Sequence, residues 1–161
     1  MGFEKTILNE TEMIAFGMML GPLLSSGAII YLNGSLGVGK TTFVRGLLRG
    51  LGFQGKVKSP TYSIIQPYTI SSNTIFHCDF YRLQTPKSLD EMGIQDYFTP
   101  GVIALIEWPE IGKGIVPDAD LVCDFFLTQN EERTMHISAY TEHGEEILSH
   151  LGKKICATKR A

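Results

Sequence analysis

The sequence predicts an α/β fold, in which a mixed, mostly parallel sheet is sandwiched by helices and ends in an antiparallel hairpin. Two continuous apolar segments, residues 28–33 and 102–107, are typical of strands buried on both faces of a parallel sheet. Segments with helical spacing alternate with the strands. Two further strand-like segments, residues 120–128 and 133–141, are joined by a short polar turn, which is typical of a hairpin.

The first third of the chain predicts a helix, a turn, a buried strand and a second helix. Residues 9–20 begin with a capping residue and acids, and continue with apolar residues at helical spacing. A connection rich in glycine, proline and serine follows at residues 21–27. After the strand, a helix is expected from about Lys40 to Leu51, where glycines end it.

The remaining elements are shorter. Two prolines bracket a β-branched segment, which predicts a loop followed by an edge strand. A further strand ends at Asp79, and residues 88–98 predict a short acidic helix. A last helix is expected over residues 145–152. The basic residues beyond it predict a solvated, frayed tail over residues 152–161, with a local anion-binding patch as the alternative.

Composition excludes several classes of protein. The 161 residues suit one domain, residues 1–161, and a net charge of −3 argues against a protein that grips DNA or RNA through its own surface. Three widely spaced cysteines favour reduced thiols over disulfides or a zinc site. Residues 13–32 are long and apolar enough to suggest a membrane span, but glycine and proline interrupt them. We therefore expect a soluble, cytoplasmic protein with no membrane contact and no DNA partner.

The segment from Gly34 to Thr41, GSLGVGKT, satisfies the pattern G-x-x-x-x-G-K-[ST] at every position, between a buried strand and a helix. Glycines let backbone amides turn inward around an anion, and the helix directs its positive dipole end at the phosphates. Lys40 is expected to reach the β- and γ-phosphates, and the Thr41 hydroxyl to supply one ligand to Mg²⁺. A P-loop nucleotide site is therefore predicted, and a glycine turn without a ligand is the alternative.

Two carboxylates follow predicted strands. Glu107 ends VIALIE, and Asp79 ends TIFHCD. A P-loop site needs a carboxylate at the end of a neighbouring strand to hold Mg²⁺ and its waters. We assign Glu107 as the Mg²⁺ partner, directly or through water, and place Asp79 close to the γ-phosphate and the attacking water. The alternative for either acid is a hydrogen bond to nearby backbone amides. His77, between apolar neighbours, is interpreted as structural.

The loop SPTYS, residues 59–63, follows the P-loop helix where nucleotide hydrolases often have a switch. Thr61 either touches Mg²⁺ or senses the γ-phosphate, so that the loop is ordered in the triphosphate state. In the other interpretation its hydroxyl only caps backbone in a turn. Spacing alone leaves the two open.

The arginines favour hydrolysis over transfer to an acceptor. Small-molecule kinases of this size usually have a lid whose arginines clamp phosphates. This chain has only five: Arg45, Arg49, Arg82, Arg133 and Arg160. Two lie on the P-loop helix and one near the end, so no arginine-rich lid is expected. Without an obvious arginine finger, the protein alone is expected to hydrolyse slowly. A kinase and a nucleotide-gated binding module without catalysis are the two rival functions.

Five ordered motifs carry a resemblance to a known family. GSLGVGKTTFVRGLL, VKSPTYSIIQPY, FHCDFYRL, MGIQDYF and IEWPE together resemble TsaE (formerly YjeE), over roughly residues 5–152. The resemblance implies a cytoplasmic ATPase of bacterial tRNA threonylcarbamoyladenosine synthesis, with ATP or ADP and Mg²⁺ as cofactors. It also implies that the protein binds the TsaD–TsaB heterodimer and drives or resets its catalytic cycle. Those partners modify adenosine 37, so contact with tRNA is expected only through the complex.

The same resemblance implies roles for individual residues. Glu107 corresponds to the family's second Mg²⁺ contact beside Thr41, and Asp79 to an aspartate that matters for hydrolysis. Thr11 and Arg133 match positions that touch the nucleotide base or ribose. The family's P-loop corresponds to Gly37, Val38, Gly39, Lys40, Thr41 and Thr42.

Overall fold

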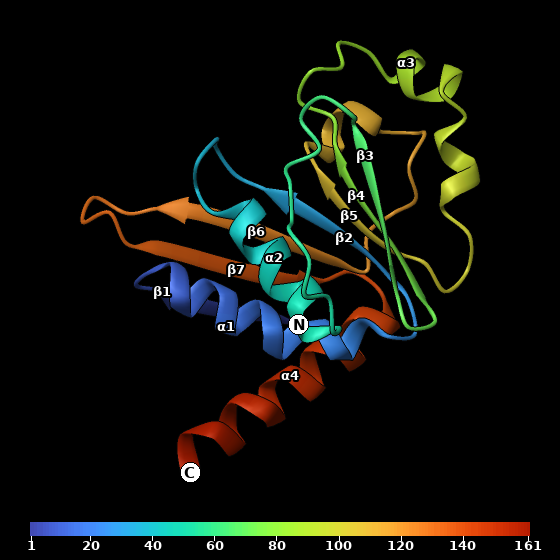
Figure 1. The fold of residues 1–161 in the computed structure, drawn as a ribbon. Helices are drawn as coiled ribbons and strands as arrows, with labels where there is room; N and C mark the ends of the chain where they lie inside the picture. Colours follow the sequence, from blue (N-terminus) through green and yellow to red (C-terminus); the bar gives the residue numbers. More distant parts are fainter.

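The computed structural model describes residues 1–161 as one seven-stranded sheet with helices packed against it (Figure 1). The strands are β1 (Gly2–Ile7), β2 (Ala28–Asn33), β3 (Ile65–Ile70), β4 (Asn73–Asp79), β5 (Ile103–Glu107), β6 (Leu121–Leu127) and β7 (Arg133–Ala139). The helices are α1 (Glu10–Leu20), α2 (Lys40–Gly50), α3 (Pro86–Glu91) and α4 (Glu142–Arg160). Three short 3₁₀ turns are η1 (Gly21–Leu24), η2 (Ile94–Tyr97) and η3 (Pro109–Gly112).

The strand order is β1-β7-β6-β2-β5-β4-β3. β2 pairs in parallel with β5 and β6, and β4 pairs in parallel with β5. The β1–β7, β6–β7 and β3–β4 pairs are antiparallel. Five strands (β1, β6, β2, β5, β4) therefore point one way, and β7 and β3 point the other way. This confirms the mostly parallel sheet, the C-terminal hairpin and the edge position of the strand that contains Pro67.

The two faces of the sheet are covered unequally. The larger core lies under α1, α2 and α4 and contains 27 buried residues, among them Phe16 and Phe43. The smaller core, with 7 buried residues such as Phe80 and Leu89, lies on the opposite face near α3 and η3. Because side chains alternate along a strand, β4 and β5 contribute to both cores. The helices therefore cover a large core on one face of the sheet and a small core on the other.

α1 and α2 lie so close together that glycine is required where they meet. A Cβ on Gly46 of α2 would lie 2.5 Å from the Ile14 carbonyl oxygen of α1. A Cβ on Gly17 of α1 would lie 2.7 Å from the Phe43 carbonyl oxygen of α2. This contact fixes the direction of α2, whose first residue is Lys40.

Three elements differ from the expectations. β1 is an additional strand, paired along its whole length with β7. The acidic segment forms two short elements, α3 and η2, because Gly93 between them takes a left-handed conformation with φ 67°. The last helix begins at a Thr141 cap and continues through Arg160, so residues 152–160 are helical where a frayed tail was expected. No helix of the chain combines the length and the apolar character that crossing a bilayer requires.

Candidate nucleotide-binding site

The P-loop connects β2 to α2 and leaves a row of backbone donors free. Gly37 and Gly39 take positive φ angles of 77° and 113°, which turn the chain around the space in front of the helix. No side chain caps α2, and the first bond of this turn runs from the Phe43 N–H to the Gly39 carbonyl at 2.9 Å. The N–H groups of Lys40 and the two threonines after it therefore have no intrahelical partner. Such a helix start is suited to bind phosphate.

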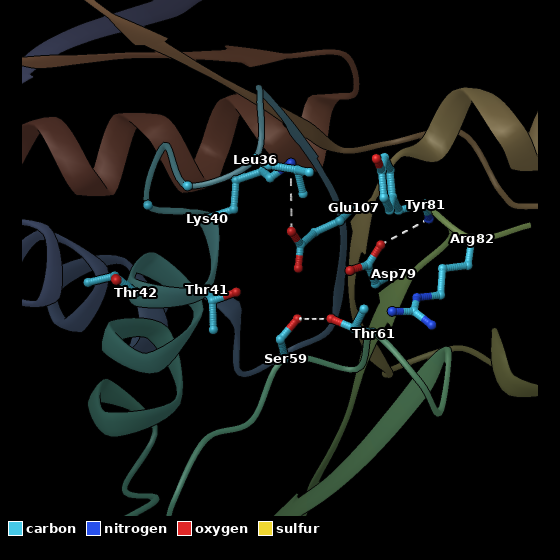
Figure 2. Close-up of a pocket in the computed structure, with 12 residues that line it drawn as sticks. Leu36, Lys40, Thr41, Thr42, Ser59, Thr61, Asp79, Tyr81, Arg82 and Glu107 are labelled. Carbon is cyan, nitrogen blue, oxygen red and sulfur yellow. Dashed lines mark hydrogen bonds and ion pairs between the residues drawn. The ribbon is translucent and has the colours of Figure 1, made fainter.

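A cavity of about 480 Å³ lies at this helix start (Figure 2). Figure 2 shows Lys40 and Thr41 on one side, Asp79 and Thr61 on the other, and Glu107 between them. All four residues predicted to be catalytic, and Thr41, therefore share one cavity. The lining residues are Leu36, Gly37, Gly39, Lys40, Thr41, Thr42, Ser59, Thr61, Asp79, Tyr81, Arg82 and Glu107.

The parallel sheet explains why the two carboxylates meet. Glu107 is the register partner of Leu32, the penultimate residue of β2, and of Asp79, the last residue of β4. The carboxyl ends of parallel strands lie at one edge of the sheet, beside the P-loop. Both acids are nearly fully buried, at 7% and 4% exposure for Asp79 and Glu107. The structure brings both strand-end acids to the cavity beside the P-loop.

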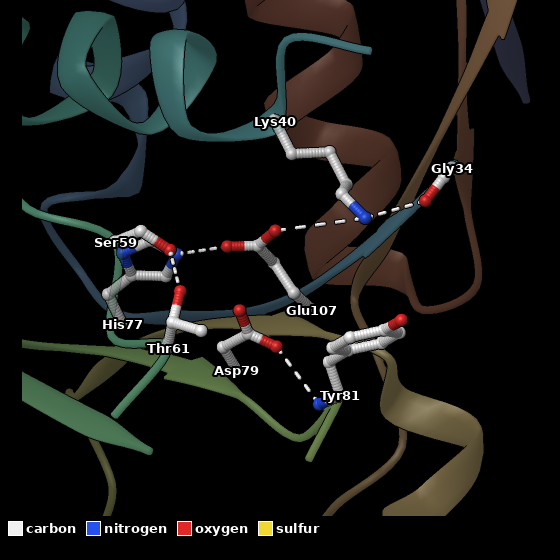
Figure 3. A network of polar contacts seen from close by, with 8 residues as sticks. All are labelled: Gly34, Lys40, Ser59, Thr61, His77, Asp79, Tyr81 and Glu107. Atoms are coloured by element: carbon white, nitrogen blue, oxygen red, sulfur yellow. Dashed lines mark hydrogen bonds and ion pairs between the residues drawn. The ribbon is translucent and has the colours of Figure 1, made fainter. Parts of the chain in front are cut away.

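Glu107 is held by two basic side chains (Figure 3). Its Oε2 lies 2.6 Å from Nε2 of the fully buried His77, and its Oε1 lies 3.8 Å from Nζ of Lys40. With the carboxylate ionised, His77 donates from Nε2, and no partner meets its buried Nδ1. The structural interpretation of His77 was thus incomplete, because this side chain sets the direction of Glu107.

Lys40 lies among three groups. Its ammonium donates to the Gly34 carbonyl at 2.6 Å and lies 4.7 Å from the centre of the Trp108 ring. Trp108 follows Glu107 directly and takes a positive φ of 56°, which is rare for a bulky residue and marks local strain. The structure thus places this tryptophan against the P-loop lysine.

Asp79 accepts a hydrogen bond from the Tyr81 backbone N–H at 3.0 Å. Burial raises the pKa of this carboxyl above its usual range, and the nearby Glu107 adds to the rise. The Tyr81 N–H, His77 and Lys40 offset part of the effect. A carboxylate with a raised pKa is a better proton acceptor than an ordinary aspartate.

The 59–63 loop presents its hydroxyls to the cavity. The Oγ atoms of Ser59 and Thr61 lie 2.8 Å apart, and both residues line the cavity opposite Thr41 (Figure 2). Residues 61–63 of this loop form a turn. The position of the loop suits contact with a terminal phosphate. The Thr61 hydroxyl bonds to Ser59 and forms no hydrogen bond with backbone, so it does not cap the turn.

The two residues expected at the base or ribose differ in placement. Arg133, at the start of β7, donates from Nε to the Val38 carbonyl at 2.8 Å and so braces the P-loop. It also lines a smaller hollow of about 110 Å³ together with Glu10 and Met13. Thr11 is exposed on α1 and lines neither hollow. Its neighbours at positions 10 and 13 face the hollow instead.

The oxygen donors in the cavity fit Mg²⁺. This ion takes few protein oxygens and completes its octahedron with water and phosphate. The Thr41 hydroxyl and the Glu107 carboxylate offer such oxygens in the same cavity. Oε2 of Glu107 is engaged by His77, which leaves Oε1, with only Lys40 nearby, as the oxygen for the ion or one of its waters.

Comparisons with known proteins agree with this fold. The family model described as "Threonylcarbamoyl adenosine biosynthesis protein TsaE" matches residues 7–137. The tRNA threonylcarbamoyladenosine biosynthesis protein TsaE of Haemophilus influenzae is 43% identical over 150 residues, which cover 89% of this chain and 93% of that protein. The protein of the same name from Bacillus subtilis is 28% identical and covers 91% of each chain. The crystal structure of Bacillus subtilis YdiB matches with a TM-score of 0.80, at 26% identity and 96% coverage of both chains. The chain therefore belongs to the TsaE family.

Proposed function

We propose that this chain is a Mg²⁺-dependent ATPase that acts in the threonylcarbamoyladenosine modification of tRNA. The names of its relatives support the pathway, and the site supports the reaction. One observation carries the proposal: a complete P-loop and two strand-end carboxylates, Glu107 and Asp79, line the same cavity. The proposal includes a cytoplasmic location.

The residues divide into a binding group and a hydrolytic group. The free N–H groups at the start of α2 and the Lys40 ammonium bind the phosphates. Thr41 and Glu107 hold Mg²⁺, which neutralises phosphate charge when bound. Asp79 accepts the proton of the attacking water, for which burial and its raised pKa suit it. Thr61 contacts the terminal phosphate from the loop side.

We further propose that the hydrolysing protein works on the TsaD–TsaB heterodimer and resets it between turnovers. Two large apolar side chains stand exposed beside the cavity, Leu36 at 65% and Tyr62 at 85% exposure. A partner that covers them would exclude water from the site and fix the loops around it. Turnover is therefore expected to be slow in the isolated chain and faster with the partners. Contact with tRNA is expected only through the complex.

A turnover assay tests this proposal, with and without TsaD–TsaB. Lys40→Ala is expected to lower hydrolysis by about 10²-fold, because a buried donor to the reacting phosphates is lost. Lys153→Ala, an exposed lysine of α4, is the matched control and is expected to leave the rate unchanged. Rapid hydrolysis by the isolated chain that Lys40→Ala does not affect contradicts the proposal. Labelled γ-phosphate on an added acceptor, in place of free phosphate, would instead indicate a kinase.

A further inference from the structure

Arg82 is the only arginine that lines the main cavity. The sequence alone did not place Arg82 in the cavity, because this residue lies in none of the predicted helices or strands. Figure 2 shows its side chain on the wall that carries Asp79 and Thr61, opposite Lys40 and Thr41. The cavity thus has a cation on each side of the place where phosphates fit.

The backbone at Arg82 is held firmly. It lies in a turn closed by the Leu83 N–H, which donates to the Phe80 carbonyl at 2.9 Å. The side chain of Phe80 is fully buried in the smaller core, and its N–H donates to the Glu107 carbonyl at 3.2 Å. The Asp79 carboxylate accepts from Tyr81 within the same turn. The chain therefore fixes the origin of the Arg82 side chain relative to both acids.

The guanidinium itself has no polar partner in the protein. It stacks on the ring of Tyr62, 4.2 Å from the ring centre, and forms neither an ion pair nor a hydrogen bond. Two other arginines are engaged: Arg45 pairs with Glu10 at 3.0 Å, and Arg133 donates to Val38. Asp79 and Glu107 line the same cavity, yet neither pairs with Arg82. Its planar set of N–H donors therefore remains available for a ligand.

We propose that Arg82 is a catalytic arginine supplied by the chain itself, which binds the γ-phosphate of ATP, and that Tyr62 is its positioning residue. The proposal rests on the proposed ATPase function. The P-loop amides and Lys40 bind the phosphates from the α2 side, so the terminal phosphate faces the wall of Asp79 and Arg82. A guanidinium there can bind two phosphate oxygens at once, which a lysine cannot reproduce.

In the hydrolytic step, the water oxygen bonds to the γ-phosphorus and the bond from that phosphorus to the β–γ bridging oxygen breaks. The proton of the water goes to Asp79, and ADP and inorganic phosphate leave. Arg82 neutralises the charge on the γ-oxygens during this exchange. A cation–π contact with an exposed ring stabilises the cation only weakly. The Arg82 side chain is therefore near the site but weakly restrained, which would keep turnover slow until a partner covers the Tyr62 loop.

Arg82→Ala and Arg82→Lys test the arginine, with Arg49→Ala on the exposed side of α2 as the matched control. Affinities are measured for ADP and for the β,γ-imido analogue of ATP, together with the hydrolysis rate. For Arg82→Ala we expect ADP affinity within twofold of wild type, analogue affinity at least fivefold weaker and hydrolysis at least tenfold slower. Arg82→Lys falls in between, and the control matches wild type.

Tyr62 is tested by rescue. Tyr62→Ala is expected to slow hydrolysis several-fold with unchanged ADP affinity and melting temperature, because only the direction of Arg82 is lost. Tyr62→Phe keeps the ring and is expected to match wild type. A Tyr62→Phe protein as slow as Tyr62→Ala contradicts the stacking role.

The outcomes separate the two proposals. An Arg82→Ala protein that binds the analogue and hydrolyses ATP like wild type overturns the role of Arg82. A wild-type chain that never hydrolyses ATP overturns the ATPase function, while the comparison of ADP with the analogue still decides whether Arg82 meets the γ-phosphate. Because Arg82 is exposed, its variants are expected to fold, and circular dichroism checks this.

Discussion

The two walls of the nucleotide cavity are built in different ways. The P-loop wall stands on α2, which packs backbone to backbone on α1 over the larger core. The opposite wall consists of the 59–63 loop and the turn after Asp79, supported by the smaller core. It also exposes aromatic rings, such as Tyr62 and Tyr81. Under the proposed function, the P-loop wall would bind phosphate in a fixed geometry, and the opposite wall would respond to the terminal phosphate or to a partner.

The largest expected effect comes from breaking the rigid wall. Gly46→Val places side-chain atoms against the Ile14 carbonyl, which a Cβ alone would approach to 2.5 Å. We expect a loss of about 3 kcal/mol in the free energy of unfolding, because neither backbone has room to give way. At about 2–4 °C for each kcal/mol in a chain of this size, thermal unfolding shows the change directly.

Gly152→Ala is the control for that experiment. A Cβ on Gly152 meets no other atom, and the residue lies inside α4. This substitution is expected to stabilise the chain by about 0.5–1 kcal/mol, because alanine loses less backbone entropy in a helix. Equal effects of the two substitutions would show that α1 and α2 are not in close contact.

A smaller effect is expected from the acid of the second wall. The fold raises the pKa of Asp79, so its ionisation costs stability. This cost is present above the folded pKa and absent below the ordinary value of 3.8. Asp79→Asn is therefore expected to raise the melting temperature by a few degrees at pH 7, with no gain below about pH 3.8.

The exposed Asp90→Asn on α3 is the control for that change and is expected to leave the melting temperature at pH 7 unchanged. Asp79→Asn is also expected to slow hydrolysis, because the amide cannot accept the proton of the attacking water. A gain in stability with a loss of activity is common at functional sites. A variant that is destabilised at pH 7 would contradict this description of the acid.

Thiol labelling gives the smallest and most local comparison. Cys78 belongs to the smaller core and Cys123 to the larger one, whereas Cys156 is exposed. Burial raises the pKa of Cys78 to about 12 and that of Cys123 well above its usual range, so neither thiol reacts in the closed fold. Cys156 is expected to react at once, then Cys78 and last Cys123, as mass spectrometry with iodoacetamide would show. Nucleotide is expected to slow Cys78. Equal rates for the two buried thiols would mean that both walls open together.

The sequence predicted those parts of the site that depend on short-range patterns. The P-loop is one uninterrupted segment, and Glu107 and Asp79 each end an apolar strand, so the rule for parallel sheet edges placed them together. Arg82 escaped notice because its position depends on a turn and on Tyr62, which comes from a separate loop. The contact between His77 and Glu107 depends on the pairing of β4 with β5, which no local sequence pattern predicts.

Other differences have equally plain causes. β1 is short and half exposed, and only its pairing with β7, over 120 residues away, makes it a strand. Thr11 lies one residue from Glu10, which on a helix means a rotation of about 100° away from the hollow that Glu10 and Met13 line. α4 continues past Gly152 because a glycine inside a helix costs only about 1 kcal/mol.

The register between β4 and β5 has a consequence for how this protein tolerates change. Asp79 lies opposite Glu107, and Ile75 of the larger core lies opposite Ile103. A single residue inserted in β4 would turn Asp79 towards the smaller core. It would also exchange the side chains that β4 contributes to the two cores. Insertions that misalign the carboxylates therefore also unfold the protein. Among soluble variants from a mutant library, the two carboxylates would therefore stay aligned. Inactive members of that set would carry mainly substitutions and few insertions in β4.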